Sequence, residues 1–466
     1  MKDYFLLKND TITAISSPLG IGAISIIRIS GNKTLEIINK IFISKNNKIY
    51  NNKINFGIIK YKNDIIDQVI VLFFKAPNSY TGEDIIEINC HGSIYIQNKI
   101  ISIIIKYGAR LAINGEFTYR AYINKKISLL QAESVLDTIN SNNKLEHKQA
   151  INNLINNKLY YYLNKIEKII INLLSYIEIN LDFIEVELDN NNIYKNILLI
   201  KNKLKKLINS FKINNIIKKG VYITIIGPVN SGKSTLMNRI INENKSIVSN
   251  IPGTTRDIVE GMININNFNF YFYDTAGIRN TKSKIEKIGI KKTYNSIKNT
   301  NIIFFVFDYK LLNKKEKIYK IIKNKKKIIK NKTVLFIANK IDKNNYNNLY
   351  KKYKYLKINS RKYRIIYISA KKKIGLNKIK RELKNMLPNK ILLNNYLINN
   401  VRHYKELKII YKYIKKVEID YKNNIQLELI SIDIKNSLQH LYKITGKYYT
   451  NNNILNNIFK NFCIGK

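Results

Sequence analysis

One stretch near the middle of the chain constrains its fold and chemistry more than any other. An apolar run from Val221 to Ile226 is followed by a loop that begins at Gly227 and by a segment of helical spacing that ends at Ile241. The loop reads Gly-Pro-Val-Asn-Ser-Gly-Lys-Ser, which is the Walker A spacing. Its glycines let successive N–H groups point at phosphate oxygens, at the positively polarised start of the following helix. The sequence therefore predicts a strand, a phosphate-binding loop and a helix.

Further segments, in the order typical of guanine nucleotide sites, extend this prediction. Lys233 is expected to reach the β and γ phosphates, and Ser234 to bind Mg²⁺. Adjacent threonines in a loop complete such a magnesium shell, and an Asp-Thr-Ala-Gly segment after a strand lies near the metal and the γ phosphate. A carboxylate at Asp342 can accept both N1–H and N2–H of guanine, a pair of donors that adenine lacks. The predicted GTP-binding residues on these grounds are Ser231, Gly232, Lys233, Ser234, Thr235, Thr254, Thr255, Asp274, Thr275, Ala276, Gly277, Asn339, Lys340, Asp342, Ser369, Ala370 and Lys371.

The charge balance of the chain has two explanations. The 466 residues include 81 basic and 32 acidic side chains, for a formal net charge of +49. A charge of this sign and size suits an RNA partner. Lys, Asn, Ile and Tyr are also the residues of AT-rich codons, so biased mutation could produce the same balance without selection for binding. Both causes stay open at the level of sequence, and lysine runs such as 323–332 are typical of a solvated face.

Cysteine usage and the start of the chain indicate its compartment. The two cysteines, Cys90 and Cys463, lie far apart and have no metal-ligand spacing around them. This usage is typical of a reducing compartment. The first ten residues are interrupted by charge too early for a signal peptide, and no apolar run reaches about 18 residues. We therefore predict a cytoplasmic protein with no membrane association.

The pattern of apolar residues divides the chain into segments. Residues 1–122 alternate β-rich runs at 11–17, 23–29, 69–74 and 85–90 with helical spacing at 33–42 and 94–107, which indicates an α+β domain. Residues 123–215 show long helical spacing, as in Ile170, Leu173 and Ile177. The nucleotide motifs occupy 216–385, and helical spacing returns in 386–466, most clearly at 397–417 and 430–444. The predicted fold is thus a multidomain α+β and α/β protein, in which a helical domain is interrupted by a P-loop domain.

Motifs outside the nucleotide segments identify a family. These motifs are Asp10-Thr11-Ile12-Thr13-Ala14-Ile15, Arg28-Ile29-Ser30-Gly31, Ser79-Tyr80-Thr81-Gly82-Glu83-Asp84, Cys90-His91-Gly92, Gly115-Glu116-Phe117-Thr118, Arg120-Ala121, Gln131-Ala132-Glu133 and Phe462-Cys463-Ile464-Gly465-Lys466. With them, the chain resembles the tRNA-modification GTPase family MnmE, also called TrmE, over its whole length.

The resemblance implies a pathway, partners and cofactors. It implies a folate-binding-like N-terminal domain, a Ras-like GTPase domain, and a homodimer joined through the N-terminal domains. It also implies an FAD-dependent MnmG-like partner, with which such proteins add an aminomethyl or carboxymethylaminomethyl group at C5 of the wobble uridine, U34, of certain tRNAs. A reduced folate, 5-formyl- or methylene-tetrahydrofolate, would supply the carbon, and glycine or ammonia the nitrogen. By similarity the folate site consists of Arg28, Glu87, Lys126 and Lys466.

The family also implies how GTP is hydrolysed. Where a Ras-like enzyme places a glutamine to orient water, this chain has Ile278, which cannot form a hydrogen bond. The family uses K⁺ at this step, and the matching positions are Asn230, Ser249, Ile251 and Thr254, with Mg²⁺ on Ser234 and Thr255. Glu286 matches the glutamate that positions water. The resemblance thus adds Asn230, Ser249, Asn250, Ile251, Pro252 and Gly253 to the expected GTP-binding residues.

Two other readings remain open from the sequence. A ribosome-assembly GTPase of the Era or EngA kind that binds rRNA shares the nucleotide motifs and suits the positive charge. It does not explain the β-rich residues 1–122 or the interrupted helical domain. A degenerate protein that retains GTP cycling without modification chemistry is the second.

Overall fold

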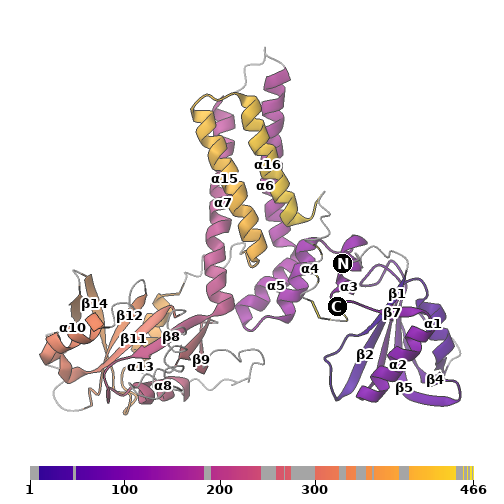
Figure 1. Cartoon of the computed structure of the whole chain (residues 1–466), viewed down its shortest axis with the longest axis horizontal. Helices are drawn as coiled ribbons and strands as arrows, with labels where there is room; N and C mark the ends of the chain where they lie inside the picture. The colour runs from indigo at the N-terminus through magenta and orange to yellow at the C-terminus, as the bar shows by residue number, and fades with distance from the viewer. Residues whose placement is uncertain are drawn as a thin grey trace, which may run out of the picture. The chain divides into compact units, whose positions relative to one another are not determined.

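A computed structural model gives the architecture of the chain as two compact units (Figure 1). The first contains Met1–Asn140, Ala150–Lys205 and Val401–Lys466, and the second contains Ser141–Gln149 and Lys206–Asn400. The structure describes residues 10–45, 49–182, 190–242, 259–266, 268–273, 300–324, 332–342, 353–358, 361–387, 398–447, 455, 459, 462, 463 and 465. Within these ranges, no helix combines the length and apolar character needed to span a bilayer.

A mixed sheet organises the start of the first unit, in the order β3-β4-β5-β6-β2-β1-β7. Neighbouring strands run antiparallel, except that β1 and β7 are parallel. The elements are β1 Thr11–Ile15, β2 Gly22–Ser30, α1 Thr34–Ile41, β3 Phe42–Ser44, β4 Ile54–Tyr61, β5 Asp64–Phe74, β6 Ile85–Gly92, α2 Ile94–Lys106 and β7 Ala109–Leu111. The predicted β-rich runs and both predicted helices are therefore confirmed, with small shifts at their ends.

The two faces of this sheet differ in burial. In β6, Ile86, Ile88 and Cys90 are buried in the core formed with α1 and α2. The alternate residues Glu87 and His91 point to the opposite face, as the period of two in a strand requires. The predicted strands thus carry polar residues on a face that no helix of this core covers.

Strand β4 was missed from the sequence because its centre is Gly57, a residue that favours turns over strands. A Cβ atom at Gly57 would lie 2.2 Å from the carbonyl oxygen of Ile43 on β3. The absence of a side chain at Gly57 therefore lets the backbones of β3 and β4 approach closely.

Long helices form the remainder of the first unit. Helix α6 buries Ile166, Ile170, Leu173 and Ile177, so the predicted apolar stripe is confirmed at Ile170, Leu173 and Ile177. Helix α16 packs against α15 and α6. The helices are α3 Glu116–Ile123, α4 Leu129–Ile139, α5 Lys144–Asn156, α6 Lys158–Asp182, α7 Asn190–Lys219, α15 Val401–Lys422 and α16 Leu427–Thr445, with α5 and α7 continuing into the second unit. Helix α15 ends five residues later than predicted, because its buried positions continue to Val417 and Glu418.

The second unit is built on a sheet of the order β13-β14-β12-β11-β8-β10-β9. Strands β10, β8, β11, β12 and β14 are parallel to their neighbours in this series. The elements are β8 Val221–Ile226, α8 Lys233–Asn242, β9 Val259–Ile265, β10 Phe268–Tyr273, β11 Ile302–Asp308, η2 Tyr309–Lys314, α10 Lys315–Asn324, β12 Thr333–Asn339, β13 Tyr355–Ile358, β14 Arg361–Tyr367 and α13 Leu376–Asn385.

Helices cover both faces of this sheet. Phe304 on β11 packs with Leu236 of α8 and Ile379 of α13, whereas the next residue, Phe305, packs with Ile318 of α10. Because the central strands are parallel, their carboxyl ends meet at one edge of the sheet, where ligands bind in open α/β folds. The predicted interrupted helical domain and P-loop-type α/β fold are confirmed.

Candidate functional sites

The phosphate loop lies between β8 and α8, as predicted. Gly227 has φ 157° and lies so close to β11 that a Cβ atom there would be 1.8 Å from the carbonyl oxygen of Val306. Asn230 and Gly232 have φ 61° and 88°, which places both in the left-handed region. Positive φ at these positions curls the loop ahead of the first turn of α8, where free N–H groups attract anions. The backbone geometry therefore suits a phosphate cradle.

The ammonium group of Lys233 lies over this loop. Its Nζ atom donates hydrogen bonds to the carbonyl oxygens of Pro228 at 2.8 Å and Gly227 at 3.3 Å. The adjacent Ser234 and Thr235 are exposed in the first turn of α8. This arrangement presents a cation and two hydroxyl groups on the same short segment.

Asn339 joins three predicted segments into one surface. Its Nδ2 atom donates to the carbonyl oxygen of Ser231 in the phosphate loop at 2.9 Å. Its Oδ1 atom accepts hydrogen bonds from the N–H groups of Ala370 at 3.0 Å and Lys340 at 2.8 Å. A Cβ atom at Gly232 would lie 2.3 Å from Nδ2, so only glycine fits there. The sequence predicted Asn339 as a GTP-binding residue, but its role as a structural bond between segments was missed.

Asp342 is held by the Ser-Ala-Lys segment. Its Oδ1 atom accepts a hydrogen bond from the Ser369 hydroxyl at 2.5 Å, and that hydroxyl accepts one from Lys372 N–H at 3.1 Å. Lys340 has φ 69°, and its Nζ atom forms an ion pair with Asp308 Oδ2 at 3.2 Å. The predicted residues at 339–342 and 369–371 are thus brought together at the same edge as the phosphate loop.

Several predicted site residues lie outside the described residues. They include the switch segment, the Asp-Thr-Ala-Gly segment, the water-positioning glutamate and the terminal lysine. These residues are Ser249, Asn250, Ile251, Pro252, Gly253, Thr254, Thr255, Asp274, Thr275, Ala276, Gly277, Glu286 and Lys466.

A second candidate site lies on the open face of the N-terminal sheet. Arg28 on β2 stands opposite Glu87 on β6 in the strand register. Two guanidinium nitrogens of Arg28, Nη2 and Nε, donate to Glu87 Oε1 at 2.6 and 2.9 Å. The guanidinium also lies 5.5 and 5.7 Å from the ring centres of Phe117 and Tyr80. Arg28 and Glu87, both predicted for the folate site, therefore form one partly buried ion pair beside two aromatic rings.

The end of the chain reaches the same place. Arg28 Nη1 donates to the carbonyl oxygen of Gly465 at 3.3 Å, and Ser16 Oγ donates to that oxygen at 3.1 Å. Lys126 follows helix α3, and its Nζ atom donates to the carbonyl oxygen of Pro77, in the loop that carries Tyr80, at 2.9 Å. The structure thus gathers Arg28, Glu87 and the C-terminal segment, and joins Lys126 to them through this loop.

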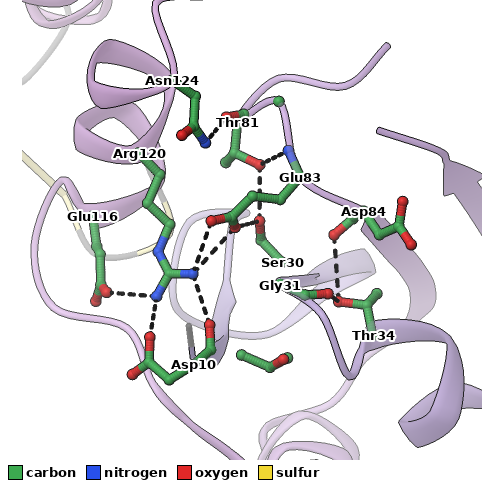
Figure 2. A network of polar contacts seen from close by, with 12 residues as sticks. Asp10, Ser30, Gly31, Thr34, Thr81, Glu83, Asp84, Glu116, Arg120 and Asn124 are labelled. Atoms are coloured by element: carbon green, nitrogen blue, oxygen red, sulfur yellow. Dashed lines mark hydrogen bonds and ion pairs between the residues drawn. The ribbon is translucent and has the colours of Figure 1, made fainter. Parts of the chain in front are cut away.

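Sequence reasoning missed the buried ion network behind this loop (Figure 2). Arg120 donates to Asp10 Oδ1 at 2.6 Å, to Glu83 Oε2 at 3.1 Å and to Glu116 Oε1 at 3.1 Å. Glu83 also accepts a hydrogen bond from the Ser30 hydroxyl at 2.7 Å. Burial opposes the charge of Arg120, but the three carboxylates outweigh it and raise its pKa. These residues stand in the segments that carry the family resemblance. The i,i+4 spacing of Glu116 and Arg120 on α3 is a local signal for their pair, whereas no spacing predicts the contacts of Arg120 with Asp10 and Glu83.

The remaining candidate groups are clusters of potential metal ligands and the two cysteines. No group of three or more His, Cys, Asp or Glu side chains that could hold a metal ion occurs among the described residues. Burial raises the pKa of the Cys90 thiol to about 11, and the charge of Asp67 adds to this effect. Cys90 therefore remains a protonated core residue at neutral pH, while Cys463 is exposed.

Comparisons with known proteins cover almost the whole length of the chain. A family model described as the GTP-binding protein TrmE N-terminus matches residues 11–126, and one for the MnmE helical domain matches residues 129–463. The tRNA modification GTPase MnmE of Flavobacterium psychrophilum is 40% identical over 476 residues, covering 99% of this chain and 100% of the relative. Its counterpart in Fervidobacterium nodosum is 39% identical over 477 residues, with 99% and 98% covered. A crystal structure of Aquifex aeolicus Era bound to GDP and AlF4⁻ is 27% identical, with a TM-score of 0.26 and coverage of 41% of this chain and 66% of that one. The chain belongs to the MnmE (TrmE) family of tRNA modification GTPases.

Proposed function

We propose that the edge of the second unit's sheet binds GTP and that the chain hydrolyses it. The proposal rests on the two hydrogen bonds of the Asn339 side chain. One goes to the carbonyl oxygen of Ser231 in the phosphate loop, and the other comes from the N–H group of Ala370 in the Ser-Ala-Lys segment. A nucleotide with its phosphates on this loop would place its base near residues 339–342 and 369–371. Asp342, oriented by Ser369, then accepts N1–H and N2–H of guanine.

The residues at the phosphate end fit the Mg²⁺ that accompanies GTP. Ser234 presents an exposed hydroxyl beside Lys233, and Mg²⁺ prefers oxygen ligands of this kind together with phosphate oxygens. We assign Ser234 and Thr255 to this ion. Lys233 neutralises charge on the β and γ phosphates, as the position of its ammonium group over the loop allows.

Water activation follows the family pattern in the proposal. Water attacks the γ phosphorus, and the bond to the bridging oxygen of GDP breaks. Because Ile278 cannot orient water, Glu286 takes that role. A K⁺ ion held at this site would supply a fixed positive charge where negative charge grows in the transition state, an effect worth several kcal/mol. We assign Asn230, Ser249, Ile251 and Thr254 to K⁺, and the exposed side chain of Asn230 in the loop is compatible with it.

We further propose that the N-terminal site binds a reduced folate for tRNA modification. A pterin has an amino-pyrimidinone edge like that of guanine, so a carboxylate such as Glu87 can accept its paired N–H groups. Both bonds from Arg28 end on Oε1 of Glu87. Arg28, Lys126 and Lys466 add cations that suit the carboxylates of a folate. With an FAD-dependent MnmG-like partner, the product is an aminomethyl or carboxymethylaminomethyl group at C5 of U34 in tRNA.

The open face of the N-terminal sheet supports a homodimer. Ile54 on β4 and Ile24 on β2 are 73% and 69% exposed, and Phe56 and Ile70 on the same sheet are also exposed. Contiguous exposed apolar residues on a sheet are typical of an interface. We propose that a second copy of the chain covers this face, next to Arg28 and Glu87. Such a dimer would act in the cytoplasm.

The domain boundaries are part of the same proposal. We assign folate binding and dimerisation to residues 1–122, GTP chemistry to 216–385, and the helical domain to 123–215 and 386–466. A ribosome-assembly GTPase of the Era or EngA kind does not account for the family matches at residues 11–126 and 129–463.

One assay tests the proposal. GTP turnover by the purified chain is measured in potassium and in sodium chloride at equal ionic strength, with and without 5-formyltetrahydrofolate and the flavoprotein partner. We expect turnover in potassium to exceed that in sodium at least tenfold. Equal turnover in the two salts would remove K⁺ from the mechanism. Mass analysis of U34 in cells with and without the gene tests the tRNA step. If U34 is the same in both, the protein cycles GTP without modification chemistry.

A further inference from the structure

Helix α15 carries a row of exposed lysines that the proposed GTP and folate sites do not use. The α15 basic row consists of Lys405, Lys408, Lys412 and Lys415. Steps of three, four and three residues place these side chains on one helix face, with about 5–6 Å between successive Cβ atoms. The opposite face is buried in the bundle through Leu407, Ile410 and Ile414. Between Lys405 and Lys415, every exposed residue of the helix is a lysine.

Acidic residues are turned away from this row. In this stretch of α15, which the structure describes throughout, the only acidic residue is Glu406. Its Oε2 atom contacts His440 Nδ1 of α16 at 2.6 Å, so it faces the neighbouring helix. Glu418, further along, is buried and pairs with Lys201 of α7. The row therefore presents four positive charges outward, while Glu406 and Glu418 of the same helix pair with residues of neighbouring helices.

A helix that gathers like charges at these spacings works against its own stability, because such pairs repel. A bound polyanion removes that repulsion. Lys408 is held by a cation–π contact, with Nζ 4.7 Å from the ring centre of Tyr404. A basic row with an aromatic residue beside it matches the phosphates and exposed bases of RNA.

We propose that the α15 basic row is a docking surface for the phosphate backbone of tRNA, an inference that rests on the proposed function. A membrane surface fits less well, because an interfacial helix needs apolar side chains beside its lysines. The exposed positions from 405 to 415 include none. The contact is electrostatic and reads no base sequence.

The test compares two triple variants of the full chain that lose the same charge. One is Lys408→Gln, Lys412→Gln and Lys415→Gln, and the control is Lys317→Gln, Lys320→Gln and Lys323→Gln on the exposed face of α10. Affinity for an unmodified tRNA transcript is measured by fluorescence anisotropy from 50 to 300 mM KCl. The α15 variant should bind about 30-fold more weakly, with the slope of log K against log salt reduced by about 2 to 3. The control should change by about twofold or less.

Equal weakening of both variants would show that total charge alone governs binding and would overturn the docking surface. Unchanged tRNA affinity of the α15 variant would do the same. So would an α15 variant that keeps its affinity for tRNA but binds vesicles of 30% phosphatidylserine more weakly than the wild-type chain does. Basal GTP turnover and circular dichroism of each variant verify folding. Failure of the wild-type chain to bind tRNA or to modify U34 would instead refute the proposed function. Wild-type binding with no effect of the three substitutions refutes only the docking surface.

Discussion

The two candidate sites are assembled in different ways. The nucleotide site takes its residues from short segments at 227–234, 339–342 and 369–371, each at the end of a parallel strand. The N-terminal site joins Arg28 to Glu87 across an antiparallel pair and both to Gly465 near the end of the chain. Parallel strands bring their carboxyl ends to one edge, so consecutive motifs meet there. On an antiparallel face, side chains from distant segments meet only through strand register and packing.

This difference has a consequence for mutation. A substitution in a contiguous motif acts on one ligand contact, whereas a substitution in a discontinuous assembly also releases the segments that it joins. Ion pairs in the first unit illustrate the second case, since Glu133 on α4 binds Arg402 and His403 on α15. The predictions below probe this contrast.

The largest effect is expected for Asp342→Asn. The substitution replaces one of the two acceptor oxygens with an NH2 donor, so N1–H and N2–H of guanine can no longer both be accepted, and GTP affinity should fall about 10³-fold. Xanthine has a carbonyl where guanine has its 2-amino group, and an Asn amide can donate to it, so affinity for XTP should rise. Equilibrium titration with fluorescent analogues of both nucleotides measures the two values.

The matched control for this substitution is Ser369→Ala, which removes the hydroxyl that donates to Asp342. It should weaken GTP binding by about tenfold while retaining the preference for guanine. If Asp342→Asn instead weakens GTP and XTP equally, the carboxylate serves the structure of the loop and the contrast between the sites is lost.

The next effect concerns acid stability of the first unit. Burial of Glu133 opposes its ionisation, but the charges of His403 and Arg402 and their hydrogen bonds outweigh burial and hold its pKa at about 2, below the usual 4.5. Because the folded pKa is depressed, this stabilisation is full above about pH 4.5 and is lost as the pH falls toward 2. It amounts to roughly 3 kcal/mol. Urea unfolding followed by circular dichroism at pH 7, 4 and 3 measures the loss.

Glu133→Gln provides the comparison. It should lower stability at pH 7 and flatten the pH dependence between 4.5 and 2, because the titrating group is gone. An unchanged acid profile in this variant would mean that other carboxylates, such as those around Arg120, govern acid unfolding.

A smaller effect is expected at the N-terminal site. Arg28→Lys retains the charge but loses the paired donors to Glu87, and Lys cannot replace such fork geometry. Binding of 5-formyltetrahydrofolate should weaken about 20-fold, as measured by calorimetry. GTP affinity of the same protein should stay within twofold. Unaltered folate binding would reduce the Arg28–Glu87 pair to a structural contact.

The sequence predicted the contiguous features and missed the others for identifiable reasons. Val221–Ile226 and the loop after it are a local pattern, and the apolar stripe of α6 has helical period, so both were predicted. The bond from Asn339 to Ser231 spans 108 positions in the chain, and no periodicity encodes such a pair. Arg28 and Glu87 were chosen from family resemblance alone. Their ion pair depends on β2 and β6 being neighbours with Arg28 opposite Glu87, and the alternation within each run does not say which two strands pair.

The smallest effect is expected for the N-terminal cap of helix α4, a local sequence feature in the first unit. Ser128 begins α4 with a capping box: its hydroxyl accepts from Gln131 N–H, and the Gln131 side chain accepts from Ser128 N–H. Ser93 also precedes a helix, α2, but makes no side-chain cap hydrogen bond. Ser128→Ala should therefore cost about 1 kcal/mol of unfolding free energy, and Ser93→Ala a few tenths at most. Urea denaturation of both variants measures the difference. Equal losses would show that the cap hydrogen bonds contribute nothing and that α4 is held by the contacts of Glu133 with its partners alone. In that case, contacts between distant segments would stabilise even a helix whose start the sequence marks clearly.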